Sequence, residues 1–379
     1  MATVTSYDTA HGKRWRVRYA RPDGRHTDKR GFPTKKAAEG WAAENTVSIN
    51  TGSWVDPKYA KLTVGALGDE WMARQTHLKR SSRKPVDTAW RLRVKPRWGQ
   101  VAIGDIRPSQ VQAWLSGLTK IAKKADATPE PLGATGVIYA HQVLSAILGD
   151  AVRDRMLAAN PCDGMDLPRK GQKRKVYLTH EQLHRFAAEV AAGTVDPVAR
   201  SVLVLTLGYT GLRWGEATGL RVRGVNALRR RLVVRDNAVE VDGDIQVGTT
   251  KGHRMRTVPV PAFLMNQISD LVDGRGPDDL VWAHPDGGYL PLPPYERGWW
   301  QQAVIRAELP RITPHDLRHT AASLSVSAGA NVKALQRMLG HVSAAMTLDT
   351  YSDLFDDDLD SVADALDAAV VKLGIAPTG

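Results

Sequence analysis

One run of residues, 200–220, limits most strongly what this chain can fold into. It reads RSVLVLTLGYTGLRWGEATGL, and most of its first half is apolar, as in a helix enclosed by a core. Glycines then recur at short intervals, with Arg213 and Glu216 among them. The run predicts a buried helix that leads into a glycine-rich turn, so the protein needs a core large enough to enclose that helix.

Length and composition are those of a globular protein of two or three domains. The chain has 379 residues, 42% of them hydrophobic and 24% charged, which is enough apolar sequence for a sizeable core. No apolar run approaches the roughly 18 residues needed to cross a bilayer, and the first residues lack the apolar segment of a secretion signal. The single cysteine, Cys162, can form neither an internal disulfide nor, alone, a thiolate metal site. We therefore expect a protein of a reducing cytoplasm.

The net charge of +12 makes an anionic polymer the expected partner, with nucleic acid ahead of a membrane surface. Within residues 1–58, three arginines alternate with aromatic and apolar residues along one predicted strand: Arg14, Arg16 and Arg18. A Pro-Asp-Gly turn, a second strand and a helix that Thr34 would cap follow, which predicts a small three-stranded sheet plus a helix. The arginine face is either a solvated strand face or the side of a β-ribbon that enters a DNA groove.

Residues 62–167 are mostly helical in pattern. The segment 136–154 places its apolar residues on one stripe: Val137, Ala140, Val143, Leu144, Ile147, Leu148 and Ala151. The region also carries basic clusters, and four residues of the first cluster are candidate DNA contacts: Lys79, Arg80, Arg83 and Lys84. We predict an all-α basic bundle, whose positive charge meets either phosphate or only water.

A basic run over residues 168–176 marks the next boundary. It could follow a DNA duplex with three consecutive cations: Lys173, Arg174 and Lys175. Beyond it, residues 230–260 alternate like strands joined by tight turns, whereas Thr313 and Pro314 mark the start of a helix. Residues 176–379 are therefore predicted to form a mainly α-helical domain with a small β-sheet, and the whole chain a multidomain α+β protein.

The stretch HDLRH at residues 315–319 nearly copies the zinc-protease signature H-E-x-x-H. On a helix, His315 and His319 would share a face, but Asp316 is one methylene shorter than the glutamate of that signature. Arg318 would also place a full positive charge beside the ion, and such a neighbour repels a metal and attracts a phosphate. The stretch therefore favours an anion, and we expect no metal and no other cofactor. His319 is interpreted as a packed or helix-stabilising histidine.

Five stretches of this third part, in this order and spacing, resemble those of the tyrosine recombinases, the phage-integrase family. They are TGLRWGE with Arg213, KGHRMRTVP with Lys251, HDLRHTAASL with His315 and Arg318, LGH with His341, and Tyr351 ten residues later. One such stretch would be weak evidence, whereas five in order cover about half of the chain. The regions ahead of them fit the larger members of the family, with an arm-type DNA-binding domain at 1–58 and a helical core-binding domain at 62–167.

The resemblance implies that two arginines hold the scissile phosphate of a DNA strand. Arg213 and Arg318 suit this role because a guanidinium stays protonated and grips oxygens with two parallel donors. Glu216 and Asp316, which lie beside them in the sequence, are expected to brace the arginines rather than to take part as acids.

The resemblance also implies how the protons and the covalent bond are handled. Tyr351 would attack phosphorus and form a 3′-phosphotyrosine, which stores the bond energy so that resealing needs neither ATP nor a metal. Lys251 would protonate the departing 5′ oxygen, and His315 would hold or relay the proton of the nucleophile. His341 would donate a hydrogen bond to a phosphate oxygen.

The expected function is that of a site-specific DNA recombinase, a phage-type integrase that integrates and excises a mobile element. The resemblance implies a homotetramer on double-stranded DNA, with core and arm sites, and a Holliday junction between two duplexes. A host DNA-bending protein and an excision factor are expected partners in the cytoplasm of a bacterial host, at its nucleoid. The alternatives are a type IB topoisomerase, a catalytically inactive DNA-binding relative and a metallohydrolase.

The chain ends in an acidic segment with apolar residues at helical spacing: Leu359, Val362, Leu366, Ala369 and Leu373. An acidic tail is a poor DNA binder, so its stripe should face protein. It either packs on its own domain or, as in members of the family, docks on a neighbouring subunit and couples cleavage between protomers.

Overall fold

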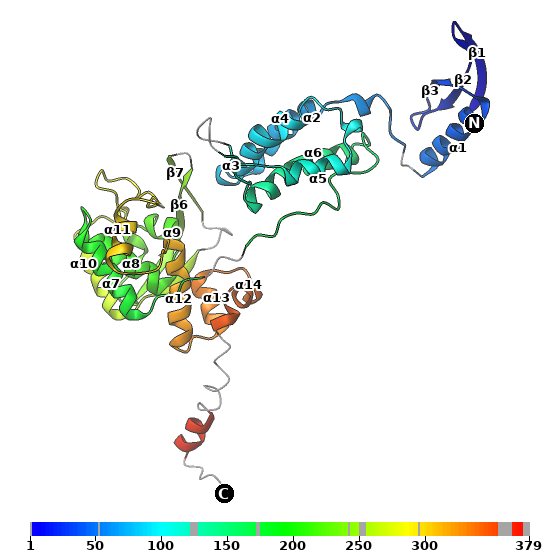
Figure 1. The fold of residues 1–379 in the computed structure, drawn as a ribbon. Coiled ribbons are helices and arrows are strands. Elements are labelled where there is room, and N and C mark those ends of the chain that lie inside the picture. Colours follow the sequence, from blue (N-terminus) through cyan, green and yellow to red (C-terminus); the bar gives the residue numbers. More distant parts are fainter. Residues whose placement is uncertain are drawn as a thin grey trace. The chain divides into compact units, whose positions relative to one another are not determined.

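A computed structural model describes residues 2–51, 54–121, 128–171, 175–241, 243–249, 255–294, 296–354 and 366–373 (Figure 1). The chain divides into two compact units, Met1–Gln172 and Lys173–Gly379. Their buried side chains form three separate hydrophobic clusters: one in the N-terminal sheet and helix, one within residues 64–167 and one within residues 176–354. No described helix is long and apolar enough to cross a bilayer. The expected mixed fold, with helices in the majority and small antiparallel sheets, is confirmed.

The N-terminal sheet has three antiparallel strands in the order β1-β2-β3: β1 (Thr3–Thr9), β2 (Gly12–Ala20) and β3 (His26–Phe32). On β2, Val17 and Tyr19 are buried and pack with the helix α1 (Lys35–Asn50), because alternate side chains of a strand point to opposite faces. Thr34 caps α1, since its hydroxyl accepts a hydrogen bond from the Ala37 backbone N–H at 3.2 Å. The predicted alternation on β2 and the predicted cap are both confirmed.

The helical region that follows consists of α2 (Val64–Ala73), α3 (Arg80–Ala89), a π-helical turn (Trp90–Val94), α4 (Lys95–Trp98), α5 (Pro108–Ser116) and α6 (Ala134–Arg153), with short 3-10 turns at Tyr59–Lys61, Gln75–His77 and Ile103–Asp105. All seven residues of the predicted stripe on α6 are buried, and all but Ala140 belong to the hydrophobic cluster of this region. The stripe fixes which face of α6 turns inward, as predicted.

The second unit is built around α8 (Pro197–Thr210), which packs against α7 (His180–Ala192), α10 (Ala262–Val272) and α12 (Pro314–Ser327). Most of the side chains of α8 are buried, as the apolar run predicts. Gly211 then ends α8 in the left-handed conformation, with φ of 65°, and the chain turns into α9 (Trp214–Thr218). A residue with a side chain at position 211 would be strained, because L-amino acids rarely adopt this positive φ. Its Cβ would also lie 2.5 Å from Cδ2 of Leu339.

The predicted strands at residues 230–260 form two sheets rather than one. In the first, β5 (Arg231–Val234) lies between β4 (Val225–Asn226) and β8 (Arg256–Pro259), whereas β6 (Asp236–Val241) and β7 (Asp244–Thr249) form a separate hairpin. The remaining helices are α11 (Trp299–Arg306), α13 (Val332–Leu339) and α14 (Ala344–Tyr351), with 3-10 turns at Val222–Gly224 and Ser352–Leu354.

The C-terminal segment is described only over residues 366–373, which are helical up to 372. Leu366 and Leu373 of the predicted apolar stripe are 63% and 73% exposed, and Ala369 is exposed as well. Leu359 and Val362 lie outside the described residues. The described part of the stripe is therefore largely exposed.

Candidate active site

A buried carboxylate links two arginines at the start of α9. The Glu216 side chain is 1% exposed and accepts a hydrogen bond from Arg213 Nη1 at 2.9 Å. Arg256 on β8 grips the same carboxylate with two parallel donors, at 2.9 and 2.7 Å, and also donates from Nε to the Met338 carbonyl. Burial alone would raise the pKa of Glu216, but the hydrogen bonds and charge of Arg256, with the charge of Arg213, lower that pKa to about 2. The carboxylate is therefore ionised and holds Arg213 in place.

The space for Arg256 depends on a glycine. Gly340 ends α13 in the left-handed conformation, with φ of 67°, and a Cβ there would lie 2.8 Å from Cδ of Arg256. The LGH stretch thus lets Arg256 reach Glu216 and positions His341 directly after the turn.

Arg318 is the most enclosed of the site's cations. It lies on α12, is 3% exposed, and donates from Nη1 to the Gly211 carbonyl at 2.6 Å and from Nη2 to the Leu339 carbonyl at 2.7 Å. Burial, with the nearby charge of Arg213, lowers the pKa of Arg318 to about 9, so the guanidinium still carries its charge at pH 7. Two fixed carbonyls therefore set the orientation of this cation before any ligand arrives.

Tyr351, the last residue of α14, is 1% exposed and lies among cationic and imidazole groups. Its phenolic oxygen is 3.0 Å from Nδ1 of His319, and its ring stacks nearly parallel to the His341 ring, with centroids 6.2 Å apart. The Lys175 ammonium lies over the same ring, 5.5 Å from its centroid, and also donates to the Thr350 carbonyl. Residues from four separate segments thus meet at one phenol.

Two histidines of this group have low pKa values. Burial is the largest cause that lowers the pKa of His319, and the neighbouring His315 is the next; together they bring this pKa to about 4. Burial and the charge of Arg318 lower the pKa of His341 to about 4, while His341 Nδ1 lies 2.9 Å from the Thr347 hydroxyl. Both imidazoles are therefore neutral at pH 7.

Most of the predicted catalytic residues meet in this site, but three predictions need comment. Lys251 lies outside the described residues. Asp316 does not brace an arginine in the described hydrogen bonds: its Oδ2 accepts from the backbone N–H and the hydroxyl of Thr313, both at 2.7 Å, because the first turn of α12 has unpaired N–H groups. His319, interpreted as a packing residue, also contacts the Tyr351 hydroxyl.

Arg256 is not among the residues predicted from the sequence, although the sequence contains a signal for it. On β8, Arg256 shares a strand face with the buried Val258, and a cation on an apolar face needs a buried partner. Lys175 is predicted from the sequence only as a DNA contact, and the structure also brings it to Tyr351.

The predicted DNA contacts differ in their surroundings. Arg14, Arg16 and Arg18 share the face of β2 opposite Val17, and Arg16 bonds Thr5 at 2.9 Å. Lys79, Arg80 and Lys84 are exposed around the start of α3, whereas Arg83 turns back to the Met72 carbonyl. Lys173 and Arg174 lie outside the described residues.

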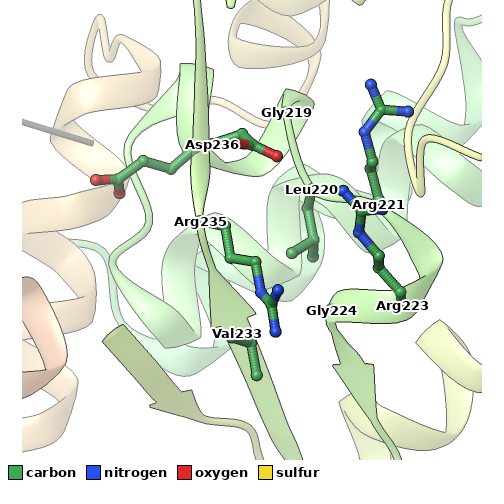
Figure 2. Close-up of a pocket in the computed structure, with 9 residues that line it drawn as sticks. Gly219, Leu220, Arg221, Arg223, Gly224, Val233, Arg235 and Asp236 are labelled. Carbon is green, nitrogen blue, oxygen red and sulfur yellow. The ribbon is translucent and has the colours of Figure 1, made fainter. Parts of the chain in front are cut away.

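A second cationic feature lies next to Glu216. Figure 2 shows this pocket, which Glu216 lines together with three arginines: Arg221, Arg223 and Arg235. Arg221 donates to the Tyr289 hydroxyl at 3.0 Å, and Arg223 pairs with Asp278. Its described lining also includes Asp236 but contains no serine, cysteine, tyrosine or histidine, so the three arginines are accompanied by two carboxylates and by no hydroxyl, thiol or imidazole nucleophile. Within the described ranges, no group of three or more His, Cys, Asp or Glu is arranged to hold a metal ion.

Comparison with known proteins agrees with this geometry. Residues 176–357, which contain Arg213, Arg318, His341 and Tyr351, match the model of the phage integrase family. The integrase of Mycobacterium phage D29 is 28% identical over 90% of this chain and 91% of its own length. The chain belongs to the phage integrase family. Membership makes it a site-specific recombinase of the tyrosine type.

Solved structures of other integrases share its fold. The solved part of the Tn1549 transposon integrase, in complex with a circular intermediate DNA, is 21% identical; the match covers 81% of this chain and 99% of the solved chain and gives a TM-score of 0.65. A lambda integrase dimer bound to a COC′ core site is 15% identical, covers 93% and 95%, and gives a TM-score of 0.56. The integrase fold therefore extends beyond the 176–357 region into the N-terminal unit.

Proposed function

We propose that this integrase cuts and rejoins DNA through a 3′-phosphotyrosine on Tyr351, and so integrates and excises a mobile element. The observation that carries the proposal is the position of the Tyr351 phenol, which is buried beside two neutral histidines and close to the charge of Arg318. An ordinary phenol has a pKa of about 10 and is a weak nucleophile at pH 7, so it needs such an environment.

Arg213 and Arg318 are proposed to hold the non-bridging oxygens of the scissile phosphate. Attack at phosphorus adds negative charge to these oxygens, and fixed cations stabilise that charge without reorganising. Glu216 supports the proposal because it restrains Arg213, and the Gly211 and Leu339 carbonyls restrain Arg318. A carboxylate that is bonded to an arginine fixes the direction of the guanidinium, although it also lowers the net positive charge of the site.

The histidines and the lysine are proposed to complete the reaction. If His341 Nδ1 accepts from the Thr347 hydroxyl, its Nε2 carries the proton and can donate it to a phosphate oxygen. His315 is proposed to hold or relay the proton of the nucleophile, and Lys251 to protonate the 5′ oxygen as it leaves.

The rest of the chain is proposed to recognise DNA. Residues 1–58 would bind arm sites through the β2 arginines, and residues 62–167 would bind core sites through the exposed cations around α3. The exposed Leu366 and Leu373 support docking of the tail on a neighbouring subunit, in a homotetramer assembled on DNA. A host bending protein and an excision factor are proposed partners, at the nucleoid of a bacterial cytoplasm.

The test uses core-site DNA that carries a nick next to the cleavage position, so that the cut strand end diffuses away. The wild-type protein should become covalently attached to a 3′ end, whereas Tyr351→Phe should bind the same DNA without attachment. Covalent attachment of the protein to DNA in excess EDTA would exclude a metallohydrolase, because EDTA removes the metal ion that such an enzyme needs. Joining of two specific sites, rather than relaxation of supercoils alone, would separate it from that of a type IB topoisomerase. Attachment of the Tyr351→Phe variant would refute the proposal.

A further inference from the structure

Two helices bring a histidine and the nucleophile into direct contact. His319 lies on α12 and Tyr351 ends α14, and the 3.0 Å between Nδ1 and the phenolic oxygen is a normal hydrogen-bond distance. The two rings meet edge to face, with centroids 5.5 Å apart. His315, one helical turn earlier on α12, places its ring 5.0 Å from the His319 ring. This contact involves the histidine that directly follows Arg318.

We propose that His319 is a catalytic residue, the first acceptor of the Tyr351 proton during strand cleavage. This inference rests on the proposed function and adds a residue to it. As the phenolic oxygen forms its bond to phosphorus, its proton moves to Nδ1 of His319, and the bond from phosphorus to the 5′ oxygen breaks. The 5′ oxygen takes a proton from the general acid or from water, so charges and atoms balance. His315 lies next to His319 and can relay the proton onward.

The surroundings of His319 keep it ready for this role. The groups that face it are His315, Asp316 and Arg318 on α12, Lys175 from the segment before α7, and Tyr351 on α14. Burial and these mainly cationic neighbours lower its pKa to about 4, so its ring is neutral in the free protein at pH 7, and the tautomer with the proton on Nε2 leaves Nδ1 as the acceptor. A DNA phosphate beside Arg318 would bring negative charge, which favours the imidazolium. The ring therefore becomes a stronger base when the substrate is in place.

The geometry also selects the substitution that tests the role. The side-chain amide of asparagine occupies nearly the same place as Nδ1 of histidine, so His319→Asn can keep a hydrogen bond to Tyr351 but cannot carry the proton. His315→Asn is the matched control, because it removes the neighbouring imidazole from the same helix. DNA binding and thermal unfolding of both variants report whether the fold is retained.

The experiment measures single-turnover cleavage of nicked core-site DNA by the full-length protein. His319→Asn should slow cleavage by about 100-fold or more, with DNA binding retained, since a positioned base contributes on the order of 10²–10⁴-fold. A ring-fluorinated tyrosine is then incorporated at position 351 in wild type and in each variant. Its phenol is more acidic and needs less help from a base, so it should recover most of the rate lost in His319→Asn.

The outcomes separate this inference from the proposed function. Cleavage by His319→Asn within about threefold of wild type would overturn the inference, and so would relief by the fluorinated tyrosine in His315→Asn but not in His319→Asn. Both results leave Tyr351 as the nucleophile. The proposed function itself fails only if Tyr351→Phe still becomes attached to DNA, or if wild type does not.

Discussion

Arg256 grips Glu216 with two parallel hydrogen bonds in a nearly solvent-free setting, and no described cation binds that carboxylate more completely. Replacing Arg256 by methionine should lower the free energy of unfolding by about 3 kcal/mol, since removal of one partner leaves a buried charge poorly compensated. Urea denaturation monitored by tryptophan fluorescence measures the change.

A double-mutant cycle distinguishes a lost charge pair from lost packing. Arg256→Met combined with Glu216→Gln should be less destabilised than the sum of the single variants, because no unpaired charge remains. The double variant should nevertheless cleave DNA poorly, since Arg213 loses its restraint. Additive single effects would show that the pair does not couple.

Arg213 and Arg318, the two arginines proposed to hold the phosphate, should respond differently to replacement by lysine. In Arg318→Lys a single ammonium cannot bond both of the carbonyls that Arg318 binds in the wild type. The free energy of unfolding should therefore fall by about 1–3 kcal/mol. Cleavage should fall on the order of 10²–10³-fold. Arg213 has a side chain that is 30% exposed, so Arg213→Lys should lose cleavage with a stability change within about 1 kcal/mol. Thermal melts and single-turnover cleavage of both variants test the contrast, and equal losses of stability would contradict it.

Much of the fold was predictable, because local periodicity and burial agree in this chain. The α6 stripe and the alternation on β2 each repeat over several residues, so one buried face follows from the sequence alone. The arrangement at Tyr351 is different. Arg213, Arg318 and Tyr351 could be named by their resemblance to a family, but their distances depend on how α9, α12 and α14 pack.

Three residues have contacts that the sequence did not predict, and these share a physical cause. Asp316, His319 and Lys175 each have a sequence neighbour that suggests one role and a spatial or capping partner that decides another. Asp316 stands beside an arginine yet caps α12, while His319 meets a tyrosine 32 positions away. The partner that each of these side chains binds depends on tertiary contacts, and these cannot be read from periodicity or from the number of charges.

Stability should fall as the medium is acidified from about pH 6.5 to about pH 4. Burial lowers the pKa of both His319 and His341 to about 4, against about 6.5 in an unfolded chain. Within this window the unfolded chain binds protons that the folded protein does not, so the free energy of unfolding decreases as pH falls. Glu216, with a pKa of about 2, adds its own loss only below about pH 4.5.

Urea denaturation at several pH values checks this dependence. The variant with both His319→Asn and His341→Asn should show a flatter slope than wild type between pH 6.5 and pH 4. An unchanged slope would assign the acid sensitivity to other groups.

Lys175 should influence cleavage more than DNA binding. Its ammonium lies over the Tyr351 ring and bonds the Thr350 carbonyl, so Lys175→Ala loosens the end of α14 and removes a charge that favours the phenolate. We expect cleavage of pre-bound DNA to slow by about 10-fold, which corresponds to about 1.4 kcal/mol of barrier. Arg169→Ala, an exposed cation of the same basic run, is the control and should weaken binding without changing the rate of cleavage once bound. Equal effects of the two variants on binding would leave Lys175 as a simple DNA contact.

The uncovered apolar residues of the tail give the last prediction. Leu366, at the start of a helix that includes Val370, and Leu373, directly after that helix, are both more than half exposed, and a stripe of this kind gains stability only when another surface covers it. Replacing both leucines by serine, or deleting residues 355–379, should leave the fold of the 176–354 region intact and should still allow covalent attachment to a single nicked site. Assembly on paired sites, and the coordination of cleavage between them, should be lost, because the tail can no longer dock on a neighbouring subunit. Gel-shift analysis of paired core sites measures assembly, and Asp367→Asn, a change on the same helix that keeps the leucines, is the matched control. If the leucine variants assemble and recombine as wild type does, the tail must have its partner within its own chain.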